Sequence, residues 1–333
     1  MKHVVIIVIL VIACTFLIHT GLTNIGLLPP EASAQSVEID QLFGIHFWLI
    51  SALFSLIMVV LVYSLIVFRR RKGETGDGEY ITGNSTLEVL WTAIPLLAVV
   101  VLAYEGGKSL GIIRRVDPSA MQVKVISGQW FWQYQYPDYG VTTSELYLPV
   151  GKQVDLVMTS NDVIHSFWVP EFRVKQDLVP GHTTELRITP TVIGDYKVRC
   201  AELCGASHAY MEGLVKVVSQ ADFDSWVSEQ QSASPMDPAL RGQQLTEQYG
   251  CINCHSVDGS EKIGPTWLRL YEAEVELSDG SSVVADDDYL RTSIINPNIE
   301  VVNGYPANVM PSFADVLDQT EVESIVAYIK TLK

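Results

Sequence analysis

The sequence predicts a multidomain membrane protein with a two-helix transmembrane hairpin, then an all-β domain, then an all-α domain. Three observations predict this order. Two long apolar segments in the first third of the chain are separated by a basic loop. After them, apolar residues alternate with period two, which is typical of half-buried strands. Towards the C-terminus, two helix-like segments flank a Cys-x-x-Cys-His motif. The 333 residues are enough for all three parts.

The hairpin is expected over residues 43–106, with helices at about 43–68 and 87–106. A run of arginines and lysine, 69–72, follows the first helix, and the positive-inside rule assigns that loop to the cytoplasm. If both helices cross the lipid bilayer, the rest of the chain lies outside. We therefore expect a multi-pass protein of a bacterial plasma membrane, with its soluble domains on the periplasmic or extracellular side.

Residues 1–34 are expected to be either a signal peptide or an extra N-terminal membrane helix. An apolar core, 4–18, follows Lys2, as in a signal peptide, and 32–34 resemble a cleavage site. Cys14 lies in a segment that loosely resembles a lipoprotein processing site. The residues alone do not choose between removal and an uncleaved helix.

The charge of the chain excludes one class of partner. A formal net charge of −16 argues against nucleic-acid binding, which usually needs a basic face. An acidic surface suits a basic protein partner or simply solubility.

The all-β domain is expected over residues 118–220. Turn signals such as Pro180-Gly181 separate short alternating segments, and this spacing indicates a sandwich or a barrel. The candidate strands are 132–136, 145–148, 154–159, 184–188, 196–200 and 214–218.

A cluster of soft ligands ends this domain. Cys200, Cys204, His208 and Met211 lie within twelve residues, and thiolate, imidazole and thioether ligands favour copper over magnesium or calcium. The cluster lacks a second imidazole. His165, which follows a strand in the same domain, is the best candidate to supply it.

The second cysteine at a spacing of four favours two copper ions over one, because a single blue-copper site needs only one thiolate. Two thiolates can bridge a copper pair that shares its odd electron. His165 and His208 would complete the equatorial ligands, with Met211 and the backbone carbonyl of Glu202 as weak axial ligands. A zinc site and a Cys200–Cys204 disulfide remain as alternatives, although neither needs the methionine.

The motif Cys251-Ile-Asn-Cys254-His255 is typical of covalent haem attachment. The two thiols form thioethers to the haem, and His255 becomes the proximal iron ligand. No cysteine or histidine follows His255, so a zinc site would lack ligands, and no β-α-β pattern supports a thioredoxin-like motif.

A second axial ligand for the haem iron is expected from Met310, which lies in an apparent loop. Helices at 240–249 and 320–332 would flank the site. The haem-binding domain is expected over 238–333, joined to the β domain by a polar linker, 221–237, with a helical start around 222–229.

Several motifs resemble those of the cytochrome c oxidase subunit II family. They are C-A-E-L-C-G-A-S-H-A-Y-M at 200–211, D-V-I-H-S-F-W-V-P at 162–170, G-Q-W-F-W-Q-Y-Q-Y at 128–136 and L-E-V-L-W-T-A-I-P at 87–95. The resemblance covers roughly residues 40–220. It implies a cupredoxin-like sandwich for the β domain and a dinuclear copper centre at the cluster.

The resemblance also implies roles for single residues. It makes Trp130 the residue where electrons arrive from a cytochrome, although alternation along 130–136 equally predicts a buried aromatic. It assigns the Glu202 side chain to a magnesium site shared with subunit I. Glu88 resembles the glutamate at the mouth of a proton channel, although a carboxylate favoured at a helix start explains it as well. His182 replaces an arginine common in the family, which puts any docking role of that arginine in doubt.

The C-terminal unit resembles class I c-type cytochromes. That resemblance implies that the carbonyl of Pro265 accepts a hydrogen bond from His255 and fixes the orientation of its imidazole.

These features together predict subunit II of a haem-copper oxidase of the caa type. Its partners would be subunit I, other oxidase subunits, an external electron donor and membrane lipid. Dioxygen reduction and proton pumping would occur in subunit I. Two alternatives remain: the copper-bearing subunit of a nitric oxide reductase, and a membrane-anchored electron carrier that acts alone. A quinol oxidase subunit is disfavoured because that relative lacks the copper ligands.

Overall fold

The computed structural model describes residues 1–73, 75–78, 80–232, 237–314 and 316–333. The chain forms two compact units, Met1–Arg115 and Val116–Lys333. Each unit is described by itself.

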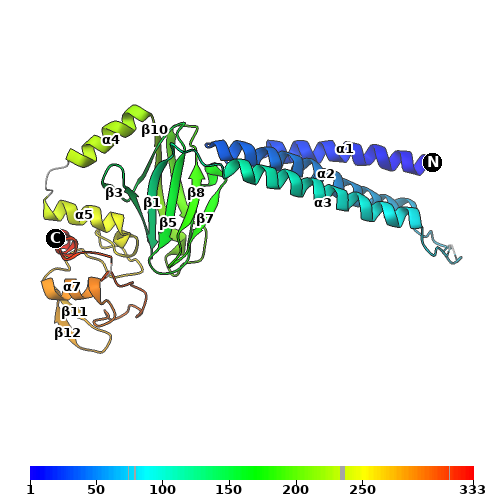
Figure 1. Cartoon of the computed structure of the whole chain (residues 1–333). Helices are drawn as coiled ribbons and strands as arrows, with labels where there is room; N and C mark the ends of the chain where they lie inside the picture. Colours follow the sequence, from blue (N-terminus) through cyan, green and yellow to red (C-terminus); the bar gives the residue numbers. More distant parts are fainter. Residues whose placement is uncertain (74, 79, 233–236, 315) are drawn as a thin grey trace. The chain divides into compact units, whose positions relative to one another are not determined.

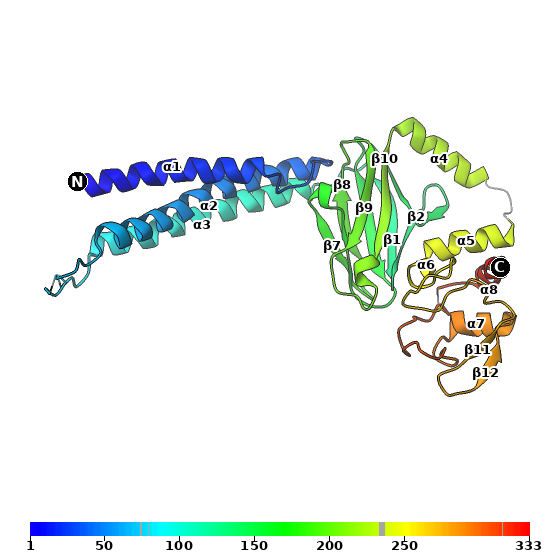
Figure 2. The same ribbon diagram turned by 180° about the vertical axis from the view of Figure 1, so that it is seen from behind.

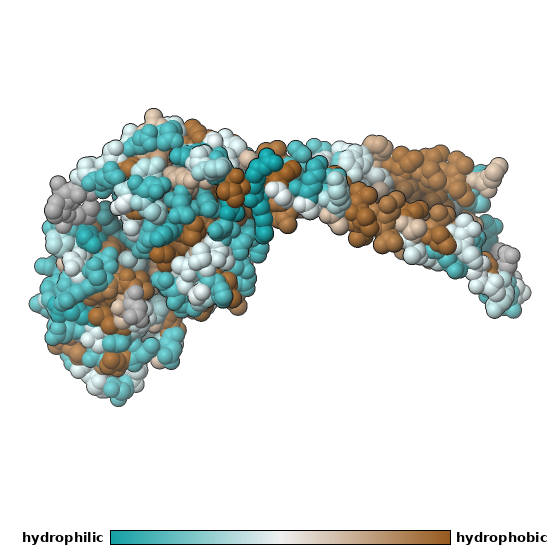
Figure 3. All heavy atoms as spheres, viewed as in Figure 1, coloured by the Kyte–Doolittle hydropathy of each residue, from teal (hydrophilic) through white to brown (hydrophobic). Residues whose placement is uncertain are grey.

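Among its described residues, the first unit contains three helices that are long and apolar enough to cross a membrane, where the sequence predicts a hairpin of two with a third left open. They are α1 (Lys2–Asn24), α2 (Ala34–Val67) and α3 (Ser85–Ile113). Hydrophobic residues gather along these helices (Figure 3). Helices of this length with exposed apolar side chains suit a lipid bilayer.

The second helix begins at Ala34, nine residues before the expected start at 43. Ser33 caps it: the Ser33 hydroxyl accepts the backbone N–H of Ser36, and the Ser36 hydroxyl accepts the N–H of Ser33. This reciprocal capping box satisfies two backbone donors that a helix start otherwise leaves unpaired. The segment that resembles a cleavage site is therefore a helix cap in the structure.

Aromatic contacts hold α1 against α2. The ring of His19 stacks on Trp48 with centroids 3.7 Å apart, and His3 Nδ1 lies 2.7 Å from the hydroxyl of Tyr63. The N-terminal segment is therefore a helix that packs on α2. Whether the segment is removed stays a prediction.

The second unit begins with a β-sandwich of two five-stranded sheets (Figure 1 and Figure 2). The first sheet has the order β3-β2-β1-β5-β8 and the second has the order β4-β10-β9-β6-β7. The strands are β1 (Met121–Gly128), β2 (Phe131–Tyr136), β3 (Val141–Thr143), β4 (Leu146–Pro149), β5 (Val154–Ser160), β6 (His165–Trp168), β7 (Lys175–Leu178), β8 (Thr184–Ile188), β9 (Gly194–Cys200) and β10 (Glu212–Val218).

The alternating pattern predicts the core of this sandwich. Trp132, Tyr134 and Tyr136 of β2 share one face of the strand, and all are buried. Phe131 lies on the other face and is buried as well, because it packs in the hydrophobic cluster of the C-terminal domain. Alternation alone does not predict that second burial.

Most of the expected linker is a packed helix, α4 (Gln220–Ser232). The ring of Trp226 stacks on Tyr147 at 4.2 Å, and Phe223 is fully buried beside Tyr136. The helix thus extends the core of the sandwich. Residues 233–236 of the expected linker lie outside the described residues.

The C-terminal domain is mainly helical, as predicted. Its helices are α5 (Pro238–Gln248), α6 (Cys251–Cys254), α7 (Asp287–Ile295) and α8 (Gln319–Ile329), with a small hairpin of β11 (Glu274–Glu276) and β12 (Ser282–Val284). A Cβ at Gly242 of α5 would collide with the backbone carbonyl of Ser324 in α8. The glycine therefore allows the first and last helices of the domain to touch backbone to backbone.

Candidate metal centres

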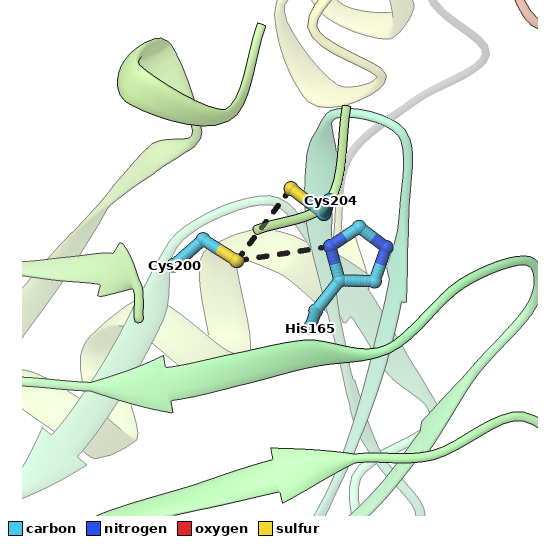
Figure 4. Close-up of side chains that lie close together, drawn as sticks. All are labelled: His165, Cys200 and Cys204. Atoms are coloured by element: carbon cyan, nitrogen blue, oxygen red, sulfur yellow. Dashed lines mark hydrogen bonds between the residues drawn. The ribbon is translucent and has the colours of Figure 1, made fainter. Parts of the chain in front are cut away.

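Strand pairing assembles the first candidate centre. His165 begins β6 and Cys200 ends β9, and the two strands pair with Phe167 opposite Cys200. Cys204 lies in the loop that follows. One ligand atom each from His165, Cys200 and Cys204 lies within 4.8 Å of the others, and all three residues are buried (Figure 4).

The remaining predicted ligands join this group. The Sγ atoms of Cys200 and Cys204 are 3.7 Å apart, and His165 Nδ1 lies 3.8 Å from the Cys200 sulfur. His208 Nδ1 lies 3.5 Å from the Cys204 sulfur. The Met211 sulfur is 3.1 Å from His165 Nδ1 and 3.7 Å from the Cys204 sulfur. All five side chains that the sequence singles out therefore converge on one buried point.

The backbone of Glu202 also turns towards this point. Its carbonyl oxygen lies 3.2 Å from the Cys200 sulfur, as a carbonyl ligand would need. The side chain of Glu202 is exposed. The backbone carbonyl and the side-chain carboxylate of Glu202 can therefore bind different partners.

The two thiols of this centre are free. Their separation of 3.7 Å is far above the roughly 2.05 Å of a disulfide. One hydrogen bond joins the two thiols, so the Cys204 thiol holds the pKa of Cys200 below its usual value, and the Cys200 thiolate raises the pKa of Cys204. A soft cation suits this pair, because thiolate is the form that binds metal.

Asp162 holds His165 in its orientation, and sequence reasoning did not single it out. A carboxylate only accepts hydrogen bonds, so His165 Nε2–H donates to Asp162 Oδ1 at 2.9 Å and Nδ1 is left free to bind a metal. The carboxylate also accepts the backbone N–H groups of Gln129 and Val163, both at 2.6 Å. Burial opposes charge on both groups, yet this bonding raises the pKa of His165 and lowers that of Asp162.

The second candidate centre is a cavity in the C-terminal domain. Cys251 and Cys254 of α6, His255 and Met310 all line it, as the haem prediction requires. Most of the other lining residues are apolar, among them Trp267, Leu290, Ile294, Val309, Phe313 and Ile325. The donor set and the apolar walls fit a covalent haem with histidine and methionine axial ligands.

The loop after α6 orients His255. A carbonyl can only accept, so His255 Nδ1–H donates to the Pro265 carbonyl at 2.8 Å, and Nε2 is left free for iron. A Cβ at Gly264 would lie 2.7 Å from the imidazole ring, so only glycine lets this loop approach. Trp267 stacks on the other side at 4.9 Å. Burial lowers the pKa of His255 and keeps the imidazole neutral.

Trp130 lies between the two centres. Its indole Nε1–H donates to the Cys204 carbonyl at 3.2 Å, and Gln129 Nε2–H donates to the same oxygen at 2.7 Å. Both residues also line the cavity that holds His255. Only 7% of Trp130 is exposed, so its indole is a buried wall between the centres.

Glu88 lies in the first turn of α3, where its carboxylate accepts the backbone N–H of Asn84 at 3.3 Å. The Asn84 side chain caps the same helix by accepting the N–H of Leu87. This arrangement fits a helix-start carboxylate, and its role at a proton channel stays a prediction.

Membrane helices, a β-sandwich with clustered soft ligands and a domain with a haem-attachment motif define a membrane-anchored electron-transfer protein. Comparison with known families agrees. Residues 18–106 match "Cytochrome C oxidase subunit II, transmembrane domain", residues 141–218 match "Cytochrome C oxidase subunit II, periplasmic domain", and residues 239–333 match "Cytochrome c".

Curated relatives extend the match along the whole chain. Cytochrome c oxidase subunit 2 of Alkalihalophilus pseudofirmus is 31% identical over 94% of this chain and 92% of its own length. The protein of that name from Thermostichus vulcanus is 35% identical over 67% of this chain and 84% of its own length. The periplasmic domain of subunit II of the Bradyrhizobium japonicum oxidase is a solved structure with 32% identity and a TM-score of 0.33, covering 35% of this chain and 97% of that one.

The chain belongs to the cytochrome c oxidase subunit II family and carries a fused cytochrome c domain at its C-terminus. The prediction from the motifs is thereby confirmed, and the chain is a subunit of a haem-copper oxidoreductase. The relatives described above are named as oxidase subunits, not as nitric oxide reductase subunits or as stand-alone carriers.

Proposed function

We propose that this chain carries electrons from an external reduced donor, through its haem-binding domain and its copper-binding domain, to subunit I of the oxidase. Bound haem c and a dinuclear copper centre supply the one-electron redox chemistry of this path. Subunit I would use the electrons to reduce dioxygen with coupled proton pumping. The shared wall of the two centres carries this proposal, because Gln129 and Trp130 bond the Cys204 carbonyl and line the haem cavity.

The copper-binding residues would hold two copper ions with little room for rearrangement. The side chains of Cys200, Cys204, His165, His208 and Met211 and the Glu202 carbonyl would supply the ligands, and the ions would supply one-electron redox chemistry. Strand pairing at Cys200 and the Asp162 carboxylate behind His165 support a rigid geometry. A centre that barely changes shape on reduction transfers electrons quickly.

The haem-binding residues would act as a fixed frame. Cys251 and Cys254 would carry the thioether bonds, His255 and Met310 would ligate the iron, and Pro265 would orient the imidazole. The apolar cavity wall excludes water, and a methionine ligand raises the reduction potential.

Two carboxylates have proposed roles towards the partner subunit. The exposed side chain of Glu202 would bind a magnesium ion shared with subunit I, while its carbonyl faces the Cys200 sulfur. Glu88 would lie at the mouth of the proton channel of the large subunit.

The location follows from the same argument. Three apolar helices anchor the chain in a bacterial plasma membrane, in contact with lipid, with both soluble domains on the periplasmic or extracellular side. The proposed boundaries are 1–34 for the N-terminal segment, 43–106 for the hairpin, 118–220 for the cupredoxin-like domain, 221–237 for the linker and 238–333 for the cytochrome c domain. The linker up to Ser232 belongs to α4, which packs on the cupredoxin-like domain.

Purification of the full chain in mild detergent tests the proposal. We expect co-purification of subunit I and other oxidase subunits, one covalent haem by staining, a mixed-valence copper spectrum, and oxygen uptake driven by a reduced donor. A chain that purifies alone, with membranes that take up no oxygen, would contradict it.

A further inference from the structure

The sulfur of Cys254 touches the copper-binding loop. Its Sγ lies 3.3 Å from the hydroxyl of Ser207, which immediately precedes the copper-ligand candidate His208. In the haem-bound chain the Cys254 sulfur becomes a thioether and has no proton, so the Ser207 hydroxyl must be the donor. One hydrogen bond then links the edge of the haem to the residue beside a copper ligand.

Ser207 is held in place for this contact. Its side chain is fully buried, and its backbone carbonyl accepts the N–H of Tyr210 in the short helical turn His208–Tyr210. The imidazole of the next residue, His208, lies 3.5 Å from the Cys204 sulfur. The route from the Cys254 sulfur through Ser207 to the copper ligands is therefore only a few atoms long.

Further close contacts join the β-sandwich to the C-terminal domain. Gly250, at φ +68°, would place a Cβ only 2.8 Å from the carbonyl oxygen of Trp130. Gln133 Nε2–H donates to the hydroxyl of Tyr249 at 3.1 Å, and the rings of Phe131 and Tyr249 meet edge to face at 5.1 Å. Phe131 and Gln133 lie on one face of β2, and Trp130 directly precedes this strand. Tyr249 and Gly250 directly precede the haem motif.

We propose that Ser207 is the positioning residue that couples the two redox centres, by donating a hydrogen bond from the copper-binding loop to the haem thioether of Cys254. In each transfer one electron leaves the ferrous haem iron, which becomes ferric, and enters the copper pair. No bond breaks and no proton is exchanged. This inference rests on the proposed function and adds the atoms through which its central step passes.

Ser207→Ala tests the contact, and the first measurement needs no copper. A hydrogen bond to the thioether sulfur withdraws electron density from the haem and stabilises its reduced form. In the full-length, copper-free protein, we expect Ser207→Ala to lower the haem reduction potential in a redox titration. Ser207→Thr, which keeps the hydroxyl, should restore it. Ser127→Ala, a fully buried serine of β1, is the matched control and should leave the potential unchanged.

The second measurement follows electron transfer from haem to copper in the metal-loaded full chain after rapid photoreduction of the haem. We expect a severalfold slower transfer in Ser207→Ala, with the mixed-valence copper spectrum intact. Gly250→Ala should slow the same step, because its Cβ would push against Trp130. Gly280→Ala, also at positive φ but with open space around the new Cβ, is its control.

A wild-type potential and a wild-type transfer rate in Ser207→Ala would overturn the inference. The proposed function would fail differently: the wild-type chain itself would lack the mixed-valence spectrum or would show no transfer between its two centres.

Discussion

The proposed copper-binding and haem-binding sites each combine a local group of ligands with one distant residue, His165 for copper and Met310 for haem, but they differ in how the cofactor would be fastened. Three of the four haem-binding side chains fall within the five residues from Cys251 to His255 and share one helical turn. The copper-binding side chains need the pairing of β6 with β9 to bring His165 to Cys200, 35 residues away. A covalent cofactor can be fastened to a local motif, whereas a bridged metal pair depends on the folded sandwich.

This difference predicts opposite sensitivities. The haem site should keep its cofactor when a single axial ligand is lost, because thioether bonds remain. The copper site should lose its mixed-valence spectrum when one of the two cysteine sulfurs is removed.

The largest effect is expected from Cys204→Ser. A hydroxyl is a poor bridge for two copper ions, so the mixed-valence spectrum and donor-driven oxygen uptake should vanish while covalent haem remains. Copper spectroscopy and haem staining of the purified chain measure the two outcomes. Cys14→Ser is the control and should change neither. A retained mixed-valence spectrum would sink the assignment of the copper pair.

Met310→Ala should leave the haem attached but lower its reduction potential, because a methionine axial ligand raises it. A redox titration gives the shift. Val309→Ala alters the same cavity wall without removing the sulfur and should leave the potential near wild type. If the two variants behave alike, another residue ligates the iron.

Asp162→Ala should weaken copper binding by about 10- to 100-fold, the usual cost of losing the partner that orients a metal-binding histidine. The haem spectrum should not change. Competition with a copper chelator measures the affinity, and Asp138→Ala, at an exposed site in the same domain, serves as control. Equal affinity in the two variants would remove Asp162 from the support of His165.

The smallest effect concerns acid stability of the haem-binding domain. Lys330 of the C-terminal helix region contacts both carboxylate oxygens of Asp287, at 2.7 and 2.9 Å, and holds the pKa of Asp287 below its usual value. This stability is present above the unfolded-state pKa of aspartate and is lost as the pH falls through the lower folded value. The pair is partly exposed, so its contribution is below about 1 kcal/mol.

Lys330→Met should therefore reduce the melting temperature slightly near pH 7 and by less near pH 3, which is below the unfolded-state pKa of aspartate. Thermal unfolding followed by haem absorbance checks this, with Lys333→Met as control. An equal loss at both pH values would mean that packing, rather than charge, explains the effect.

The sequence predicts both ligand sets because their chemistry is unusual for ordinary folded domains. Soft ligands at fixed spacings identify the metals, and period-two alternation locates β2, β5 and β8 to within a residue or so. Alternation also predicts the buried face of β2 and the burial of Trp130 just before it, whereas the hydrogen bond from Trp130 to the Cys204 carbonyl is not contained in any local pattern.

What the sequence does not predict depends on tertiary partners. Helix α4 is mostly polar, and the position of Trp226 depends on its stacking against Tyr147 of the sandwich. In the sequence Asp162 is typical of a turn, and only the folded structure shows that it accepts a hydrogen bond from His165 Nε2. The burial of Phe131 requires a second domain against the outer face of its strand.

The packing of α4 has a consequence for kinetics. Because α4 ends at Ser232 and α5 begins at Pro238, at most about 20 Å of chain separates the two helices. The haem-binding domain therefore stays close to the copper-binding domain of the same molecule. Electron transfer between the two centres is intramolecular, so its rate should be independent of protein dilution, whereas the capture of electrons from an outside donor requires a collision.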